Sequence, residues 1–133
     1  MALVEDVAAR LRTQVPSRTV YEHAVPDGKD LPAAYLLVRA AVTGEGSERF
    51  CDTTHVVSHT VRVLSIARNA DAHVAARTAD AGATFARSAL RDWRPSGGQW
   101  KLRYETGTDA FRDESTPTTT FVTPLQYSLR ATP

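Results

Sequence analysis

The spacing of hydrophobic positions changes several times along this 133-residue chain, and each change marks an expected element. Over residues 2–14, Leu3, Val7 and Leu11 recur every four residues, which is the spacing of an amphipathic helix. Pro16 ends this helix, because proline cannot extend the helical hydrogen-bond ladder. The pattern therefore predicts an N-terminal helix that buries one face.

The next apolar segments are typical of β-strands. We expect strands over residues 19–25, 34–42 and about 53–67. The third segment is long for a strand, which suggests that one of its ends projects beyond the core of the sheet. The polar segment 44–52, which contains two glycines, is expected to be the loop before it.

An alanine-rich segment then predicts a second helix, over about residues 70–93, with Asn69 or Asp71 as its N-cap. Gly82 would cost about 1 kcal/mol relative to alanine in an exposed helix, so we expect it to allow close packing on the sheet. The expected apolar face consists of two adjacent rows, which are Val74, Ala81, Phe85 and Ala89, and Ala75, Gly82, Ala86 and Leu90.

Alternating apolar and polar residues predict two final strands, over residues 99–105 and about 121–130. Pro124 lacks an amide donor, so it predicts an edge position or a bulge. The segment between the strands, residues 106–119, is rich in Thr, Asp and Ser and is much longer than a hairpin loop of about two to five residues. It is expected to be either an interaction arm or a segment that is disordered when the chain is alone.

Together these elements predict one α+β domain over residues 1–133. Its expected order is α-β-β-β-α-β-β, with a mainly antiparallel sheet of four to five strands and two helices packed on one face. The two long loops, residues 44–52 and 106–119, are expected to extend from this core.

The charge balance narrows the classes of function. The chain contains sixteen Lys and Arg residues and 15 Asp and Glu residues, which gives a net charge of +1. A dedicated nucleic-acid binder would usually carry a strong basic excess, and an electrostatic membrane binder would too. No apolar run of about 18 residues predicts a membrane span. Glu5 and Asp6 do not fit a signal peptide, so we expect synthesis and retention in a reducing cytoplasm.

Candidate catalytic and metal-binding residues are few. His55 and His59 are four residues apart, which on a strand separates them by about 13 Å, too far to share one metal ion. Two partly exposed strand histidines are the favoured interpretation, with a pH-sensitive contact as the alternative. Cys51, the single cysteine, has no accompanying signature of an activated nucleophile, and a buried or loop thiol is favoured. We expect no enzyme, no cofactor and no metal site.

Charged residues gather in the two long loops. They are Glu45, Glu48 and Arg49 in the first loop, and Asp109, Arg112, Asp113 and Glu114 in the second. The simpler interpretation is a solvated loop. The sharper one is a contact with another subunit or partner, because mixed charges set orientation and specificity between proteins.

A series of short landmarks spans nearly the whole chain. They are Val20-Tyr21, Val25-Pro26, Leu31-Pro32, Arg112-Asp113 and the segments 35–38, 59–65, 90–93 and 127–130. In this order the chain resembles the tail terminator (tail completion) proteins of long-tailed bacteriophages.

The resemblance implies a structural virion protein, not an enzyme. Such a protein forms a ring, expected to be a hexamer, which caps the finished tail tube and receives the head connector. The implied partners are further copies of the chain, the tail tube protein and the head-completion (stopper) protein, with DNA only as cargo passing through the lumen and no membrane. The implied location is the head-tail interface of the virion, and the host cytoplasm during assembly.

The resemblance also suggests roles for the charged residues. Glu45, Glu48 and Arg49 would meet a neighbour or line the lumen, and His55 would lie at the ring surface. Asp109, Arg112, Asp113 and Glu114 would contact the tail tube or an adjacent subunit. Two other functions remain open: a head-closure (stopper) or other head-tail connector protein, and a small cellular enzyme or ligand-binding α+β domain.

Overall fold

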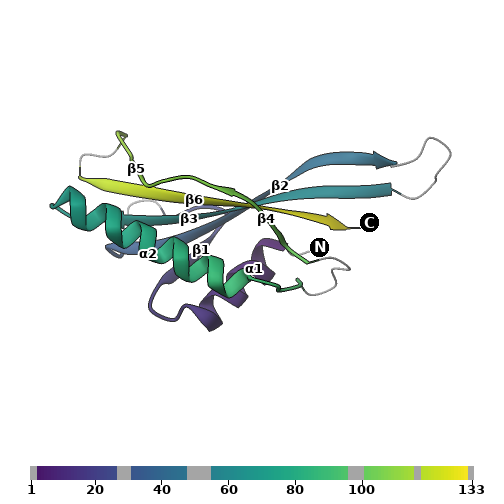
Figure 1. Ribbon diagram of the computed structural model, residues 1–133, viewed down its shortest axis with the longest axis horizontal. Helices are drawn as coiled ribbons and strands as arrows, with labels where there is room; N and C mark the ends of the chain where they lie inside the picture. Colours follow the sequence, from purple (N-terminus) through teal and green to yellow (C-terminus); the bar gives the residue numbers. More distant parts are fainter. Residues whose placement is uncertain (1–2, 27–30, 48–54, 96–100, 116–117, 132–133) are drawn as a thin grey trace.

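The protein consists of two helices and a mixed sheet, as the computed structural model shows (Figure 1). The structure describes residues 3–26, 31–47, 55–95, 101–115 and 118–131. The elements are α1 (Leu3–Gln14), β1 (Thr19–Glu22), β2 (Ala34–Ser47), β3 (His55–Arg68), α2 (Ala72–Leu90), β4 (Arg103–Gly107), β5 (Phe111–Arg112) and β6 (Thr120–Ala131). The predicted α+β class is confirmed.

The sheet has the order β1-β2-β3-β6-β4, and the two-residue strand β5 also pairs with β6. Only the pairing of β1 with β2 is parallel, and the other pairings are antiparallel. The sheet is therefore mainly antiparallel, as predicted. The strand that the sequence did not predict is β5, which lies inside the segment expected to be a loop.

Both helices lie on the same side of the sheet in Figure 1. The predicted stripe of α1 is buried there, with Leu3, Val7 and Leu11 at most 3% exposed. The inward residues of the central strands complete this main core, including Leu36, Val38, Val61, Val63, Leu125, Tyr127 and Leu129. Removal of these apolar side chains from water is the main force that holds the helix layer on the sheet.

A second, smaller apolar cluster is formed by strand residues of the opposite parity. Tyr35, Leu37, Ile66 and Val122 are buried, and Tyr21, Val25, Leu31 and Leu64 pack against them. Successive strand residues point to opposite faces, so this cluster lies on the face of the sheet that the helices do not cover.

Helix α2 begins and ends inside the predicted range of residues 70–93. The Asp71 carboxylate caps it by accepting hydrogen bonds from the amide groups of His73 (2.9 Å) and Val74 (3.4 Å). The helix ends at Leu90, because Arg91 is extended and Asp92 has a positive φ of 54°.

The predicted row Ala75, Gly82, Ala86 and Leu90 of α2 is buried, as is Ala89, but the rest of the other predicted row is not. Phe85 is 48% exposed, and Val74 and Ala81 are only half-buried. The buried row consists of Ala75, Ala79, Gly82, Ala83, Ala86, Ala89 and Leu90. Small side chains let the helix axis approach the strands, and this close approach rotates the large Phe85 toward solvent.

Gly82 allows the close packing that the sequence predicted. An added Cβ would lie 2.3 Å from Ser65 Oγ of β3 and 2.8 Å from Arg18 Nη1. Arg18 reaches this interface from the turn after α1, and its Nη2 donates to the carbonyl oxygen of Thr78 at 3.0 Å. The glycine thus leaves the space that a partly buried guanidinium group occupies.

The predicted start of the first long loop is wrong. β2 does not end at Val42 but continues to Ser47, paired with the start of β3 and with one irregularity in register between Val42 and Gly44. Residues 44–47 are therefore strand and not loop, because pairing with β3 supplies their backbone partners. The projecting end expected for the long strand is confirmed, since Figure 1 shows the β2–β3 hairpin extending beyond the helices.

The last strand, β6, agrees with the prediction of about residues 121–130, whereas the strand before it is shifted. β4 covers Arg103–Gly107 where residues 99–105 were expected, and its register shifts between Tyr104 and Thr106, as in a bulge. The carbonyl oxygen of Pro124 accepts from the Thr108 amide at 3.4 Å. Pro124 thus faces the gap between β4 and β5, where no ladder donor is needed, which explains a proline inside β6.

Candidate assembly surfaces

The first candidate surface is the β2–β3 hairpin. We call residues 39–47 and 55–58 the hairpin arm. The pairing of β1 with β2 ends at Val38, so in the described chain no strand covers the outer edge of β2 along the arm. An uncovered strand edge presents backbone N–H and C=O groups that another chain can pair with.

The structure places two of the four residues predicted around the first loop on this arm. Glu45 is in β2 opposite Val57, and His55 is the first residue of β3, opposite Ser47. Glu48 and Arg49 lie outside the described residues.

The second candidate surface is the segment around β5, residues 109–115, which we call the β5 segment. Asp109 and Glu114 are exposed, and Arg112 is exposed in β5 opposite Phe121. Asp113 is hydrogen-bonded to β6, because its backbone amide donates to the Thr120 carbonyl oxygen at 2.8 Å. The predicted interaction arm is therefore anchored to β6 over at least part of its length.

The Asp113 carboxylate also orders the turn that follows it. It accepts hydrogen bonds from the Ser115 amide at 3.0 Å and from Ser115 Oγ at 2.5 Å. These two hydrogen bonds lower the pKa of the Asp113 carboxyl below its usual value.

The two surfaces lie at opposite ends of the molecule. Figure 1 shows the β5 segment at one end of the sheet and the hairpin arm at the other. Among the described residues that the sequence singled out, Glu45 and His55 therefore lie in a different part of the molecule from Asp109, Arg112, Asp113 and Glu114.

Two exposed aromatic residues were missed by the sequence reasoning. Phe111 is 52% exposed in the β5 segment and Phe85 is 48% exposed on α2, and these are the large exposed hydrophobic residues of the described chain. Phe111 could have been found from the sequence, because it is a single phenylalanine within an otherwise polar segment. Nothing comparable marked Phe85, since its helical spacing also fits a core position.

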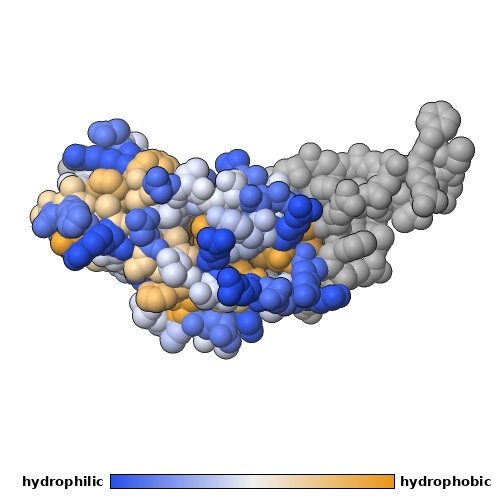
Figure 2. Space-filling view, in the orientation of Figure 1, coloured by the Kyte–Doolittle hydropathy of each residue, from blue (hydrophilic) through white to orange (hydrophobic). Residues whose placement is uncertain are grey.

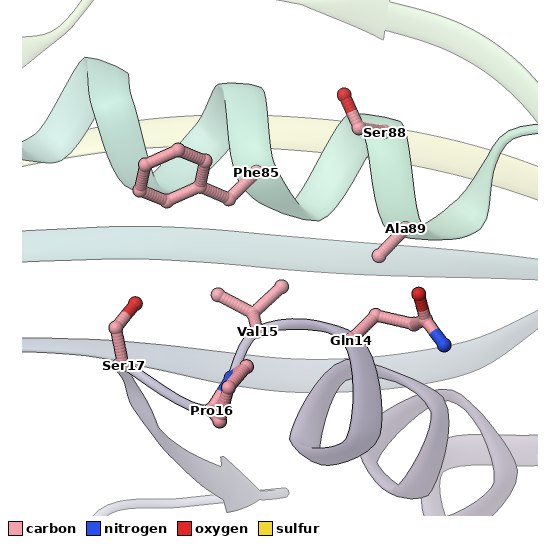
Figure 3. A pocket seen from close by; sticks show the side chains of 7 residues that line it. All are labelled: Gln14, Val15, Pro16, Ser17, Phe85, Ser88 and Ala89. Carbon is pink, nitrogen blue, oxygen red and sulfur yellow. The ribbon is translucent and has the colours of Figure 1, made fainter.

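Phe85 borders a groove of about 340 Å³ between the two helices. The residues that line it are Phe85, Ser88 and Ala89 on α2, and Gln14, Val15, Pro16 and Ser17 at the end of α1 and in the turn after it. In Figure 3, Ala89 points toward the end of α1, whereas Ser88 points away from it. Elsewhere on the face that carries α2, hydrophilic side chains are interspersed with smaller apolar patches (Figure 2).

Phe111 borders a second groove, of about 290 Å³, on the helix-free side. Its other lining residues come from β3, β6 and the end of β4: Arg62, Leu64, Thr106, Gly107, Thr108, Pro124, Leu125 and Gln126. Among the described lining residues, neither groove brings together an acid, a base and a nucleophile.

The histidine and cysteine candidates form no shared site in the described chain. His55 and His59 both lie in β3, where the strand spacing separates them, and His59 is half-buried opposite Val42 and Leu129. Cys51 lies outside the described residues. Among the residues that are described, no group of three or more His, Cys, Asp or Glu side chains could hold a metal ion.

The described part of the chain contains no helix that is both long and apolar enough to cross a membrane.

Comparisons with known proteins give a likeness in fold but none in sequence family. No family model matches the sequence, and no curated protein matches it. Among solved structures, the fold is similar to that of a chain in the virion of a native gene transfer agent particle, with a TM-score of 0.74 and 24% sequence identity. The match covers 99% of this chain and 96% of the other, so the two share their fold over essentially their full lengths.

Proposed function

We propose that this protein is a structural component of a phage-like virion, in which it forms a ring that ends the tail tube and joins it to the head connector. The observation that carries the proposal is the full-length likeness to a chain of a gene transfer agent virion. The resemblance of the sequence landmarks to those of tail terminator proteins supports the proposed position at the end of the tail.

The shape of the molecule supports assembly into a ring. A closed ring needs two different surfaces on each copy, so that one copy meets the next head to tail. The hairpin arm offers an uncovered strand edge at one end of the sheet, and the β5 segment offers Phe111 and mixed charges at the other. We propose that these two surfaces make the contacts with neighbouring copies and with the tail tube.

The proposed roles of the charged residues follow from this division. On the hairpin arm, Glu45 and His55 belong to a surface toward a neighbour or the lumen, together with Glu48 and Arg49. In the β5 segment, Asp109, Arg112, Asp113 and Glu114 belong to a surface toward the tail tube or an adjacent subunit. The near-neutral net charge suits a lumen that lets DNA pass, because strong phosphate attraction would retain it.

Electron microscopy of particles that lack this protein tests the proposal. Overlong or unfinished tails would support a tail terminator, whereas leaking heads with normal tails would support a stopper protein. Particles of normal structure and yield would contradict both. Light scattering on the purified protein tests the rival class, because a small enzyme or ligand-binding domain predicts a monomer or dimer whose melting temperature rises with its ligand.

Charge reversal in the β5 segment tests the surface itself. The double variant Arg112→Glu with Asp113→Arg should block the joining of heads to tails while the isolated chain remains folded by circular dichroism. Arg77→Glu, an exposed change on α2, is the matched control and should leave virion yield unchanged. Normal yield from the double variant would exclude this segment from the assembly contacts.

A further inference from the structure

A small polar pocket lies where the end of α2 meets the start of β4. It has a volume of about 210 Å³ and is lined by Arg87, Leu90, Arg91, Asp92, Leu102, Tyr104 and Tyr127. It is separate from both candidate assembly surfaces described above. Its unusual property is the number of hydrogen-bond donors that it gathers without a matching acceptor.

Two guanidinium groups line this pocket without a carboxylate partner in the described chain. The Arg87 guanidinium stacks on the Tyr104 ring, 4.2 Å from its centroid. Arg91 is exposed just after the last residue of α2. The pocket's own carboxylate, that of Asp92, is directed toward Lys101, whose Nζ lies 3.6 Å from its Oδ1. The pocket lining therefore contains two cationic side chains and one acidic side chain, and the acidic one is paired with Lys101.

The Tyr127 hydroxyl is a third donor. Tyr127 is only 2% exposed, and its hydroxyl has no hydrogen-bond partner among the described residues. Burial raises the pKa of Tyr127 to about 12, with the positive charge of Arg87 acting in the opposite direction, so the group is a neutral O–H donor at physiological pH. Arginine has no acceptor, and the Asp92 carboxylate is paired with Lys101 and does not reach this hydroxyl, so the hydroxyl can donate to an acceptor from another molecule.

We propose that this pocket receives the carboxylate of an Asp or Glu side chain from another protein chain of the assembly. Its oxygens would accept from the guanidinium groups of Arg87 and Arg91 and from the Tyr127 hydroxyl. Charge-assisted pairs of this kind are the stronger hydrogen bonds of proteins. The C-terminus of α2 carries a partial negative charge of about half an elementary charge, which would repel a carboxylate. The two full guanidinium charges exceed it.

A carboxylate fits the pocket better than a nucleic-acid phosphate. A side-chain carboxylate on a flexible stem can enter a space of about 210 Å³ that reaches a hydroxyl in the core. A DNA backbone would need a wider basic surface, whereas this chain has a net charge of only +1. The claim that the carboxylate belongs to an assembly partner rests on the proposed function, whereas the claim that the pocket binds a carboxylate does not.

Nuclear magnetic resonance titration of the isolated chain tests the pocket directly. Sodium acetate is the probe, and sodium chloride keeps the ionic strength constant. We expect acetate to shift the ring signals of Tyr127 and the side-chain Nε–Hε signals of Arg87 and Arg91. The dissociation constant for acetate should rise at least tenfold in Arg91→Gln and in Tyr127→Phe. Arg77→Gln, on the same helix, is the matched control and should bind acetate as the unaltered chain does.

Tyr127→Phe also separates a binding role from a structural one. The substitution keeps the ring that packs edge-on against Tyr104, with centroids 5.5 Å apart, and removes only the unpartnered hydroxyl. We expect an unchanged or higher melting temperature together with weaker acetate binding. A lower melting temperature with unchanged acetate binding would overturn the proposal, as would acetate that leaves the three sets of signals in place.

Two further arms identify the source of the anion. Inorganic phosphate and a short DNA duplex are titrated under the same conditions. If both bind more tightly than acetate, and if Arg91→Gln abolishes their binding, the ligand of the pocket is a nucleic-acid phosphate and the carboxylate proposal is wrong. Because acetate binding is measured on the isolated chain, the result does not depend on whether the chain forms a ring. An acetate-binding chain that never assembles would contradict the proposed function and leave the carboxylate pocket in place.

Discussion

Replacing Gly82 by alanine is the sharpest test of how α2 packs on the sheet. On helix propensity alone, Gly82→Ala should stabilise the protein by about 1 kcal/mol, because glycine is a poor helix former. The tertiary structure predicts the opposite sign. An added Cβ would lie 2.3 Å from Ser65 Oγ and 2.8 Å from Arg18 Nη1, both closer than van der Waals contact allows.

The size of the effect follows from these two contacts. Inserting a methyl group into a packed interior costs about 1–3 kcal/mol. Moving the Arg18 guanidinium would also weaken its hydrogen bond to the Thr78 carbonyl, and hydrogen bonds to charged groups contribute about 1.5–3 kcal/mol. The Arg18 side chain is flexible and can yield partly. After subtraction of the gain of about 1 kcal/mol in helix propensity, we expect Gly82→Ala to lower the free energy of unfolding by about 2 kcal/mol.

Urea unfolding followed by circular dichroism measures this change. Thr84→Ala is the matched control on an exposed position of the same helix, and it should be neutral or stabilising by about 0.5 kcal/mol. Adding Ser65→Ala to Gly82→Ala removes the nearest clashing atom and should restore part of the lost stability. A Gly82→Ala variant that is more stable by about 1 kcal/mol would refute the close-packing explanation.

Three other predictions concern hydrogen bonds made by polar side chains. Asp71→Ala removes the N-cap of α2 and should lower the free energy of unfolding by about 1 kcal/mol in the same urea assay; an unchanged value would exclude a capping role. Thr123→Val removes the 2.8 Å hydrogen bond from Thr123 Oγ1 to the Asp80 carboxylate and should lower it by about 1 kcal/mol, because Asp80 remains solvated; a gain in stability would contradict this. The lowered pKa of Asp113 means that its contribution to stability is present above its ordinary pKa of 3.8 and is lost as pH falls through the lowered folded-state pKa. Ser115→Ala should raise that pKa toward its ordinary value in a carboxyl-carbon NMR titration, and an unaltered pKa would show that the Ser115 hydroxyl is not its main cause.

The elements defined by local patterns were predictable from the sequence. The four-residue spacing of Leu3, Val7 and Leu11 fixes both the position and the buried face of α1. Pro124 predicted an edge position or a bulge; β6 is an interior strand, but the proline lies opposite the gap between β4 and β5, where its missing amide donor leaves no pairing unmade. Predictions of this kind hold when a residue's own chemistry decides the outcome.

The errors concern features that a distant partner decides. Residues 44–47 contain two glycines and predict a loop, yet pairing with the first residues of β3 extends the strand through them. Phe85 has core spacing on its helix, but the sheet contacts the alanine row instead, because Gly82 and its small neighbours allow a closer approach. Neither partner can be identified from the local sequence.

The grouping of site residues was less predictable than their identity. The charged residues of both loops were named from the sequence, but only the sheet order places the hairpin arm and the β5 segment at opposite ends. The pocket that joins Arg91, Tyr104 and Tyr127 depends on contacts between α2, β4 and β6, which are far apart in the sequence. Its key signal, a buried hydroxyl without an acceptor, exists only in the folded chain.

The two edges of the sheet differ in a way that bears on the proposed ring. Along the arm, the outer edge belongs to one strand, β2, from residue 39 to 47 with a single irregularity in register between Val42 and Gly44, whereas the opposite edge is divided between β4, which also has a register shift, and the two-residue strand β5. The arm can therefore offer backbone hydrogen bonds, while the β5 segment can offer mainly side chains such as Phe111. A two-fold dimer would join like edges and leave the other surface unused, whereas a ring uses both on every copy. Sedimentation of the assembled protein distinguishes these cases, because a dimer that grows no further would contradict the head-to-tail arrangement.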